Sequence, residues 1–133
     1  MYEAETTRHC VYNINYHMVW IPKYRKEVLV DGVAERAISL IYEVSRKNRY
    51  KVLALGVMPD HVHLFCSVRP NRAPSTIVKI LKGSLARTLF KDFPGLKKKL
   101  WKGHLWAPSY YVGTAGHVSA ETIKRYIEEC QRL

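Results

Sequence analysis

Hydrophobic residues change their spacing along this chain in an order that few folds can accommodate. They recur at every second residue where a strand is expected and at every third or fourth where a helix is expected. The expected elements, in chain order, are a strand at 11–20, a helix from about 31 to 48, strands at 50–58 and 61–68, a helix at 75–90, a strand at 109–114 and a last helix after Ser119. This order predicts an α+β fold of the ferredoxin-like or RRM-like split βαβ type. Such a fold has a four-stranded antiparallel sheet, two crossover helices on one face and, here, a further C-terminal helix.

Short polar residues mark two of the expected helix starts. Asp31 can cap the first helix and Ser119 the last, because a short oxygen-bearing side chain can accept a hydrogen bond from a free N–H of the first turn. Between the last strand and the last helix, the segment Gly113-Thr114-Ala115-Gly116 is expected to be flexible, since glycine allows unusual backbone angles. Such a segment would permit more than one placement of the C-terminal helix.

Length and cysteine content predict a single domain, 1–133, in a reducing, cytoplasmic setting. The 133 residues match one domain that can bury its own core. The three cysteines are odd in number, widely separated and without CxxC spacing, which disfavours both a disulfide framework and a zinc site. No apolar run reaches the roughly 18 residues of a membrane span, so no membrane partner is expected.

The charge of the chain favours a nucleic-acid partner. The 22 Lys and Arg residues outnumber 11 Asp and Glu, for a net charge of +11, and such an excess attracts polyanions. Lys79, Lys82 and Arg87, on the outer faces of the second helix, are candidate phosphate contacts, or simply a solvated face. Tyr110 and Tyr111 are candidates for stacking on unpaired bases, although strand alternation places at least one of them toward the core.

A His-x-His pair at the start of the third strand is a candidate metal site. Successive strand side chains point to opposite faces, so His61 and His63 project from the same face. The alternative is a surface pair on a half-exposed sheet. Asp60 can orient one imidazole or merely form a Pro-Asp turn. The remaining histidines have no partner at ligand spacing and are expected to serve surface or packing roles. They are His9, His17, His104 and His117.

Four segments, in order, carry a family resemblance. They are Tyr16-His17-Met18-Val19-Trp20 with Pro22-Lys23-Tyr24-Arg25, then Met58-Pro59-Asp60-His61-Val62-His63-Leu64, then Leu105-Trp106 leading to Tyr110-Tyr111-Val112-Gly113-Thr114, and Ile123-Lys124-Arg125-Tyr126-Ile127-Glu128. Through these four segments the chain resembles the single-tyrosine HUH transposases of the smallest bacterial and archaeal insertion sequences. These proteins cut and rejoin single-stranded DNA.

The resemblance implies a site and its partners. Tyr126 would attack a DNA phosphate and leave a 5′-phosphotyrosine and a free 3′-OH, while His61 and His63 would hold Mg²⁺ or Mn²⁺. A phenolate, with a pKa near 10, leaves more readily than an alkoxide, so the link can be resealed without a nucleotide cofactor. The resemblance also implies a single DNA strand folded into a hairpin. It further implies a homodimer in which the tyrosine helix can complete the partner's metal site.

The sequence departs from the family at the third metal ligand. A polar residue, often Gln, is expected four residues after the tyrosine, where this chain has Cys130. Gln131, Glu129, Cys130 and water all remain open. On periodicity alone, Tyr126 would instead be a core residue of an apolar helical stripe. The rival functions are a non-catalytic RRM-like module, whose basic-Gly-aromatic signature is absent, and a domesticated nicking relative.

Overall fold

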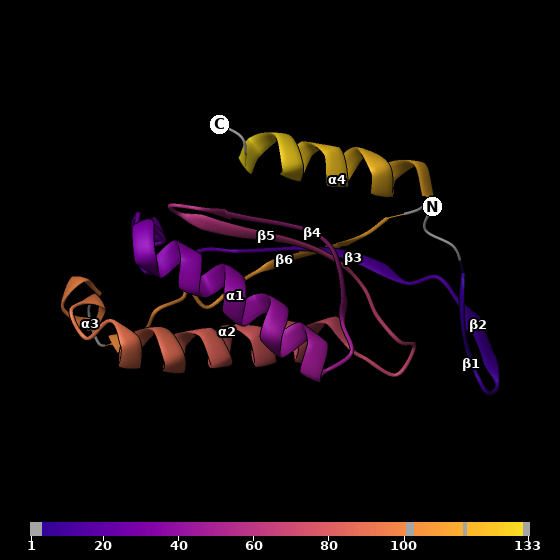
Figure 1. Ribbon diagram of the computed structural model, residues 1–133, viewed down its shortest axis with the longest axis horizontal. Helices are drawn as coiled ribbons and strands as arrows, with labels where there is room; N and C mark the ends of the chain where they lie inside the picture. The colour runs from indigo at the N-terminus through magenta and orange to yellow at the C-terminus, as the bar shows by residue number, and fades with distance from the viewer. Residues whose placement is uncertain (1–3, 101–102, 116, 132–133) are drawn as a thin grey trace.

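The computed structural model describes residues 4–100, 103–115 and 117–131, except for the side chains of 117–119, 130 and 131 (Figure 1). Four strands form an antiparallel sheet in the order β4-β5-β3-β6. Their bounds are β3 (Asn15–Trp20), β4 (Lys51–Met58), β5 (His61–Ser67) and β6 (Tyr111–Thr114). This sheet confirms the predicted α+β class.

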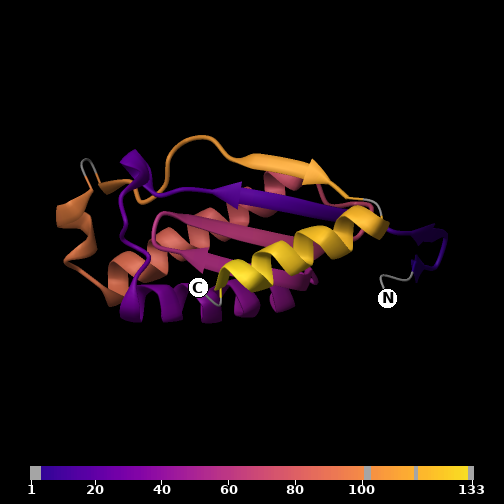
Figure 2. The ribbon, with the colours of Figure 1, turned by 90° about the horizontal axis from the view of Figure 1, so that it is seen from above.

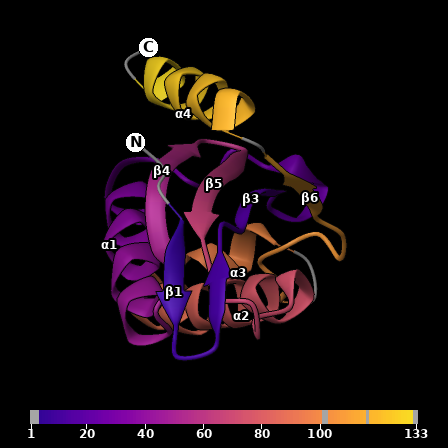
Figure 3. The same cartoon turned by 90° about the vertical axis from the view of Figure 1, so that its right-hand side faces the viewer.

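Helices cover both faces of this sheet. The crossover helices α1 (Asp31–Lys47) and α2 (Pro74–Asp92) lie on one face, and α4 (His117–Gln131) lies on the other (Figures 1 and 3). Shorter elements complete the chain, namely the hairpin β1 (Glu5–Thr7) with β2 (Cys10–Tyr12), the 3₁₀ turn η1 (Lys23–Arg25) and α3 (Leu96–Lys99). None of the described helices combines the length and the apolar character that crossing a bilayer requires.

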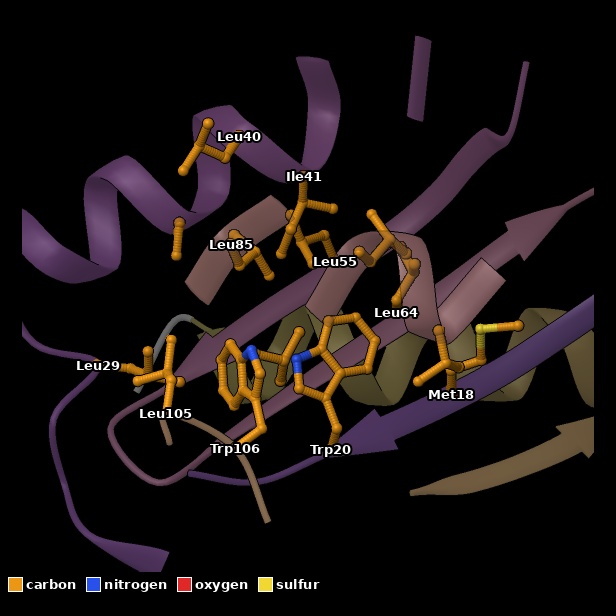
Figure 4. Packing of buried hydrophobic residues seen from close by; sticks show 14 of the residues in the cluster. Met18, Trp20, Leu29, Leu40, Ile41, Leu55, Leu64, Leu85, Leu105 and Trp106 are labelled. Atoms are coloured by element: carbon orange, nitrogen blue, oxygen red, sulfur yellow. The ribbon is translucent and has the colours of Figure 1, made fainter. Parts of the chain in front are cut away.

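The main core lies between the sheet and the α1–α2 layer. Met18 and Trp20 of β3 alternate with His17 and Val19, so the two large apolar side chains enter this core. Leu64 of β5 joins them, and Figure 4 shows these side chains packed together with residues of both helices. Each fully buried side chain of this size contributes about 1.5–3 kcal/mol through burial of apolar area. The core therefore fixes which side chains of β3 and β5 face away from it.

A second, smaller cluster holds α4 on the opposite face. It consists of Ala54 and Phe65 from the sheet and Ala120 and Ile127 from α4, with partly buried neighbours. Among the described side chains, two of these four buried residues are alanines, so this cluster is much smaller than the main core. A helix held by few buried contacts opens more easily than the rest of a fold.

Several element boundaries and caps differ from the prediction, among them the start of β6, which is Tyr111 rather than residue 109. The first strand does not begin at residue 11, because residues 10–12 pair with β1 in a separate hairpin and β3 starts at Asn15. Asp31 does not cap α1, since Val30 occupies the N-cap position and no side chain makes a capping bond. Helix α4 begins at His117, so Ser119 lies within its first turn rather than before it. The side chain of Ser119 lies outside the described residues.

Candidate active site

His61 and His63 lie side by side at the start of β5. Their ring centroids are 4.5 Å apart and the rings are nearly perpendicular, at 84°. The strand begins directly after the Pro59-Asp60 turn that joins it to β4, and both side chains are half-buried. Strand alternation turns them away from the main core, toward the face that α4 partly covers.

Asp60 orients the first of these imidazoles. One carboxylate oxygen lies 2.6 Å from His61 Nδ1, and the other accepts a hydrogen bond of 3.1 Å from Arg25 Nε. The hydrogen bond with His61 is the main cause that holds the pKa of the Asp60 carboxyl below its usual value, so the group stays ionised and accepts a hydrogen bond from the Nδ1–H of His61. The lone pair of His61 is then left on Nε2, where a metal ligand needs it. Asp60 thus both forms the turn and orients the ring.

His17 belongs to the same cluster, contrary to the prediction that it has no partner. Its Nε2 lies 3.4 Å from His63 Nδ1, and the two rings stack at 5.6 Å between centroids with planes 8° apart. The antiparallel pairing of β3 with β5 places His17 opposite Phe65, one diagonal step from His63. The signal was present in the sequence, because His17 falls on the face of the first predicted strand that points away from the core.

Burial keeps these two histidines neutral. It lowers the pKa of His17, and burial together with the neighbouring His61 and His17 lowers the pKa of His63 to about 4. A neutral imidazole is the form that coordinates a metal ion. His63 therefore offers a neutral nitrogen donor, next to the Nε2 of His61 that the bond to Asp60 leaves free of a proton.

Tyr126 stands on α4 beside this histidine cluster. Its ring meets that of His63 edge-on, with 6.1 Å between centroids and planes 80° apart. The neighbouring Ile127 is fully buried in the α4 cluster, whereas Tyr126 is 57% exposed. This exposure rules out the interpretation of Tyr126 as a core residue. The Tyr126 ring thus lies beside His63 and is largely exposed to solvent.

The described side chains provide no third ligand next to the histidine pair. Within the described part of the chain, no three His, Cys, Asp or Glu side chains converge on a point that could hold a metal. Glu129 is exposed on α4, and the side chains of Cys130 and Gln131 lie outside the described residues. The two imidazoles fit a divalent ion whose remaining ligands come from elsewhere, such as water or a phosphate oxygen.

The basic candidates on α2 lie away from this cluster. Lys79 and Arg87 are exposed on a helix that covers the opposite face of the sheet. Lys82 is half-buried, and its ammonium donates a 2.8 Å hydrogen bond to the Ala107 carbonyl, while Trp106 Nε1 donates to the Lys82 carbonyl at 2.9 Å. Lys82 thus ties α2 to the segment before β6.

The two candidate stacking tyrosines are both exposed. Tyr111 is 57% exposed, and its ring lies edge-on to His17 with 5.8 Å between centroids. Tyr110 is 37% exposed and precedes the first residue of β6. The prediction that one of them points into the core is wrong, because alternation does not begin until Tyr111 and β6 is an edge strand.

The fold of this chain is that of a transposase. Over residues 10–130 the chain matches the family described as "Transposase IS200 like", and it belongs to that family. The resemblance to single-tyrosine HUH transposases is thereby confirmed, and with it a transposase function, which implies cleavage of DNA.

Individual relatives agree with this assignment. The chain is 42% identical to the ISDra2 transposase TnpA of Deinococcus radiodurans over 126 residues, covering 95% of this chain and 90% of the relative. It is 29% identical to the transposase for insertion sequence element IS200 of Salmonella typhimurium, covering 97% of this chain and 87% of that protein.

Two solved structures share the fold. A candidate transposase from Deinococcus radiodurans R1 matches with a TM-score of 0.80 and 41% identity, covering 94% of this chain and 96% of the other. A REP-associated tyrosine transposase bound to a REP hairpin matches with a TM-score of 0.67, covering 92% of this chain and 69% of the other. At 17% identity, this second likeness concerns the fold alone.

Proposed function

We propose that this transposase cleaves and rejoins single-stranded DNA at hairpin-bearing ends of an insertion sequence, with Tyr126 as the nucleophile. The observation that carries the proposal is the exposed Tyr126 ring beside His63, next to an Asp60-oriented His61. A tyrosine that attacks a phosphodiester needs an accessible phenol close to a group that neutralises phosphate charge. This corner of the sheet supplies the phenol and two ligands for such a group.

His61 and His63 would hold a divalent ion, Mg²⁺ or Mn²⁺. When bound, such an ion supplies positive charge that polarises the scissile phosphate. The chain contributes the orientation of the donors, since Asp60 fixes the His61 ring and stacking on His17 fixes the His63 ring. Imidazole is a more usual ligand for Mn²⁺ than for Mg²⁺, so the isolated protein should favour Mn²⁺.

In the cleavage step, the Tyr126 oxygen attacks phosphorus, and the bond from phosphorus to the 3′ oxygen breaks. The phenol proton goes to solvent and the departing 3′ oxygen takes up a proton, leaving a 5′-phosphotyrosine and a free 3′-OH. A DNA 3′-OH that attacks the same phosphorus reverses the step and releases the phenol. The phosphotyrosine conserves the bond energy, so the proposal includes no nucleotide cofactor.

The DNA partner and the assembly belong to the same proposal. The net charge of +11 favours DNA, and a related fold is known bound to a REP hairpin. We assign to this chain a hairpin-forming single strand as substrate, one domain over residues 1–133 and a homodimer as the working form. The small contact of α4 with the sheet would allow this helix to serve either its own site or that of the partner.

The test is formation of a covalent protein–DNA adduct. The protein is incubated with a labelled single-stranded hairpin oligonucleotide from its element's end, with Mg²⁺ or Mn²⁺, and resolved on a denaturing gel. We expect a labelled band at the combined mass, which EDTA abolishes and added Mn²⁺ restores. Cleaved DNA without an adduct, or an adduct insensitive to EDTA, would contradict the proposal.

Replacing Asp60 tests how the first imidazole is oriented. Asp60→Asn removes the carboxylate that accepts a hydrogen bond from His61 Nδ1. We expect Mn²⁺ affinity to fall about 10- to 100-fold, which is the usual loss when a residue that hydrogen-bonds to a metal ligand is replaced. The measurement is Mn²⁺ binding followed by electron paramagnetic resonance. Asp92→Asn is the matched control, because Asp92 pairs with Arg36 on the α1–α2 side of the protein. Equal affinity in the Asp60 and Asp92 variants would show that the carboxylate has no orienting role.

A further inference from the structure

The sheet face that carries the histidine cluster is only half covered. Helix α4 packs on β4 and β5 through Ala54 and Phe65. Figures 2 and 3 show that α4 leaves most of β3 and the edge strand β6 uncovered on this face. A DNA strand that reaches Tyr126 and the two histidines has this uncovered half beside it. The side chains of β3 and β6 on this face are therefore the ones that the DNA strand would contact.

The far end of the Tyr111 side chain lies over Gly113 on this open half. A Cβ atom added to Gly113 would stand 2.4 Å from the Tyr111 hydroxyl oxygen and 3.0 Å from Cζ, so a larger residue would displace the ring. Among the described glycines, only Gly103 has a positive φ, so the backbone at Gly113 does not itself require glycine. Gly113 pairs with His17 within the sheet. Gly113 therefore leaves the space that the Tyr111 ring occupies. It lies within the sheet rather than in a hinge.

Tyr111 is also the outer member of a row of rings that ends at the nucleophile. The row runs from Tyr111 to His17 to His63 to Tyr126, with centroid separations of 5.8, 5.6 and 6.1 Å. Of the two tyrosines in the row, Tyr111 lies on the side that α4 leaves open, and its ring is 57% exposed. A pocket of about 330 Å³ adjoins it, lined by Val19, Trp20, Ile21, Ser109, Tyr110 and Tyr111. Its lining is largely apolar and aromatic, which suits the flat face of a nucleobase.

We propose that Tyr111, whose ring end occupies the space left open by Gly113, is the stacking platform for the nucleobase that flanks the scissile phosphate. The inference rests on the proposed function, since it takes single-stranded DNA as the ligand and the histidine–tyrosine cluster as the place of cleavage. Stacking on an aromatic ring tolerates any base, because every base has a π-face. Tyr111 thus positions the strand for Tyr126 without reading its sequence.

The test is a thermodynamic cycle. It compares the effect of replacing Tyr111 on the binding of intact DNA with its effect on the binding of DNA that lacks the flanking base. Binding is measured by fluorescence anisotropy in a Tyr126→Phe background, so that no cleavage occurs and the result does not depend on the nucleophile. Tyr111→Ala should weaken binding of intact DNA about 5- to 100-fold, and Tyr111→Phe should bind within about twofold of the parent. With DNA that is abasic at the flanking position, the loss from Tyr111→Ala should disappear. Tyr42→Ala is the control, an exposed tyrosine on α1, and should bind like the parent.

The variant Gly113→Ala gives an independent test of the same proposal. It should weaken DNA binding as Tyr111→Ala does, add nothing to the Tyr111→Ala variant, and leave Mn²⁺ affinity unchanged. If Gly113→Ala does not fold, as judged by circular dichroism, the Tyr111 cycle decides alone. The same loss from Tyr111→Ala on intact and on abasic DNA, or no loss on either, overturns the proposal. A protein that stacks DNA in this way yet forms no adduct would overturn the proposed cleavage and leave the stacking platform standing.

Discussion

Tyr126→Phe is expected to form no covalent adduct with DNA. The change removes only the hydroxyl oxygen that would attack phosphorus, and the ring can keep its edge-on contact with His63. Loss of the nucleophile in an enzyme that works through a covalent intermediate lowers the rate by many orders of magnitude, about 10⁶-fold in a well-studied protease. We therefore expect adduct formation to fall at least about 10³-fold, to the detection limit of a denaturing gel.

The controls separate chemistry from binding. Tyr42→Phe removes a hydroxyl from another exposed tyrosine, on α1 beneath the opposite face of the sheet, and should form adduct at the normal rate. Tyr126→Phe should still bind the hairpin oligonucleotide with nearly unchanged affinity. Peptide mapping of the wild-type adduct should place the DNA on Tyr126. An undiminished adduct in Tyr126→Phe would mean that another side chain is the nucleophile.

The sequence predicted the fold well where one periodicity ran long enough to be recognised. The alternation along β3 and the helical spacing of α1 and α2 each span several residues, and the sheet follows from their order. The hairpin of β1 and β2 escaped prediction because its strands are three residues long, too short for alternation to be distinguished from chance. The capping role assigned to Asp31 failed because a suitable residue type at a helix start does not ensure the capping bond.

The candidate site was predictable only as far as it is local in sequence. His61 and His63 are two positions apart on one strand, so their shared face follows from strand geometry. His17 and Arg25 join the cluster from 46 and 35 positions away. His17 does so through the pairing of β3 with β5, which periodicity does not specify. Charge was a poorer guide, since it could not show that Lys82 bonds to a backbone carbonyl inside the protein.

His61→Ala and His63→Ala are expected to remove metal binding and, with it, the adduct. Each change deletes one of the two neighbouring imidazoles that we propose as the metal ligands. Loss of a residue that hydrogen-bonds to a metal ligand lowers metal affinity about 10- to 100-fold. Loss of a ligand itself should therefore lower Mn²⁺ affinity at least about 100-fold. We expect Mn²⁺ binding, followed by electron paramagnetic resonance, and adduct formation at low Mn²⁺ to fall together.

The two variants should differ in what else they disturb. His61→Ala leaves Asp60 without its imidazole partner but keeps the stacked pair of His17 and His63. His63→Ala breaks that stack and also removes the ring against which Tyr126 lies. High Mn²⁺ should therefore restore more adduct to His61→Ala than to His63→Ala. His9→Ala, at an exposed histidine near the β1–β2 turn, is the matched control and should behave like the wild type. If either site variant kept both wild-type Mn²⁺ affinity and full adduct formation, the phosphate would have to be activated by groups other than this histidine pair.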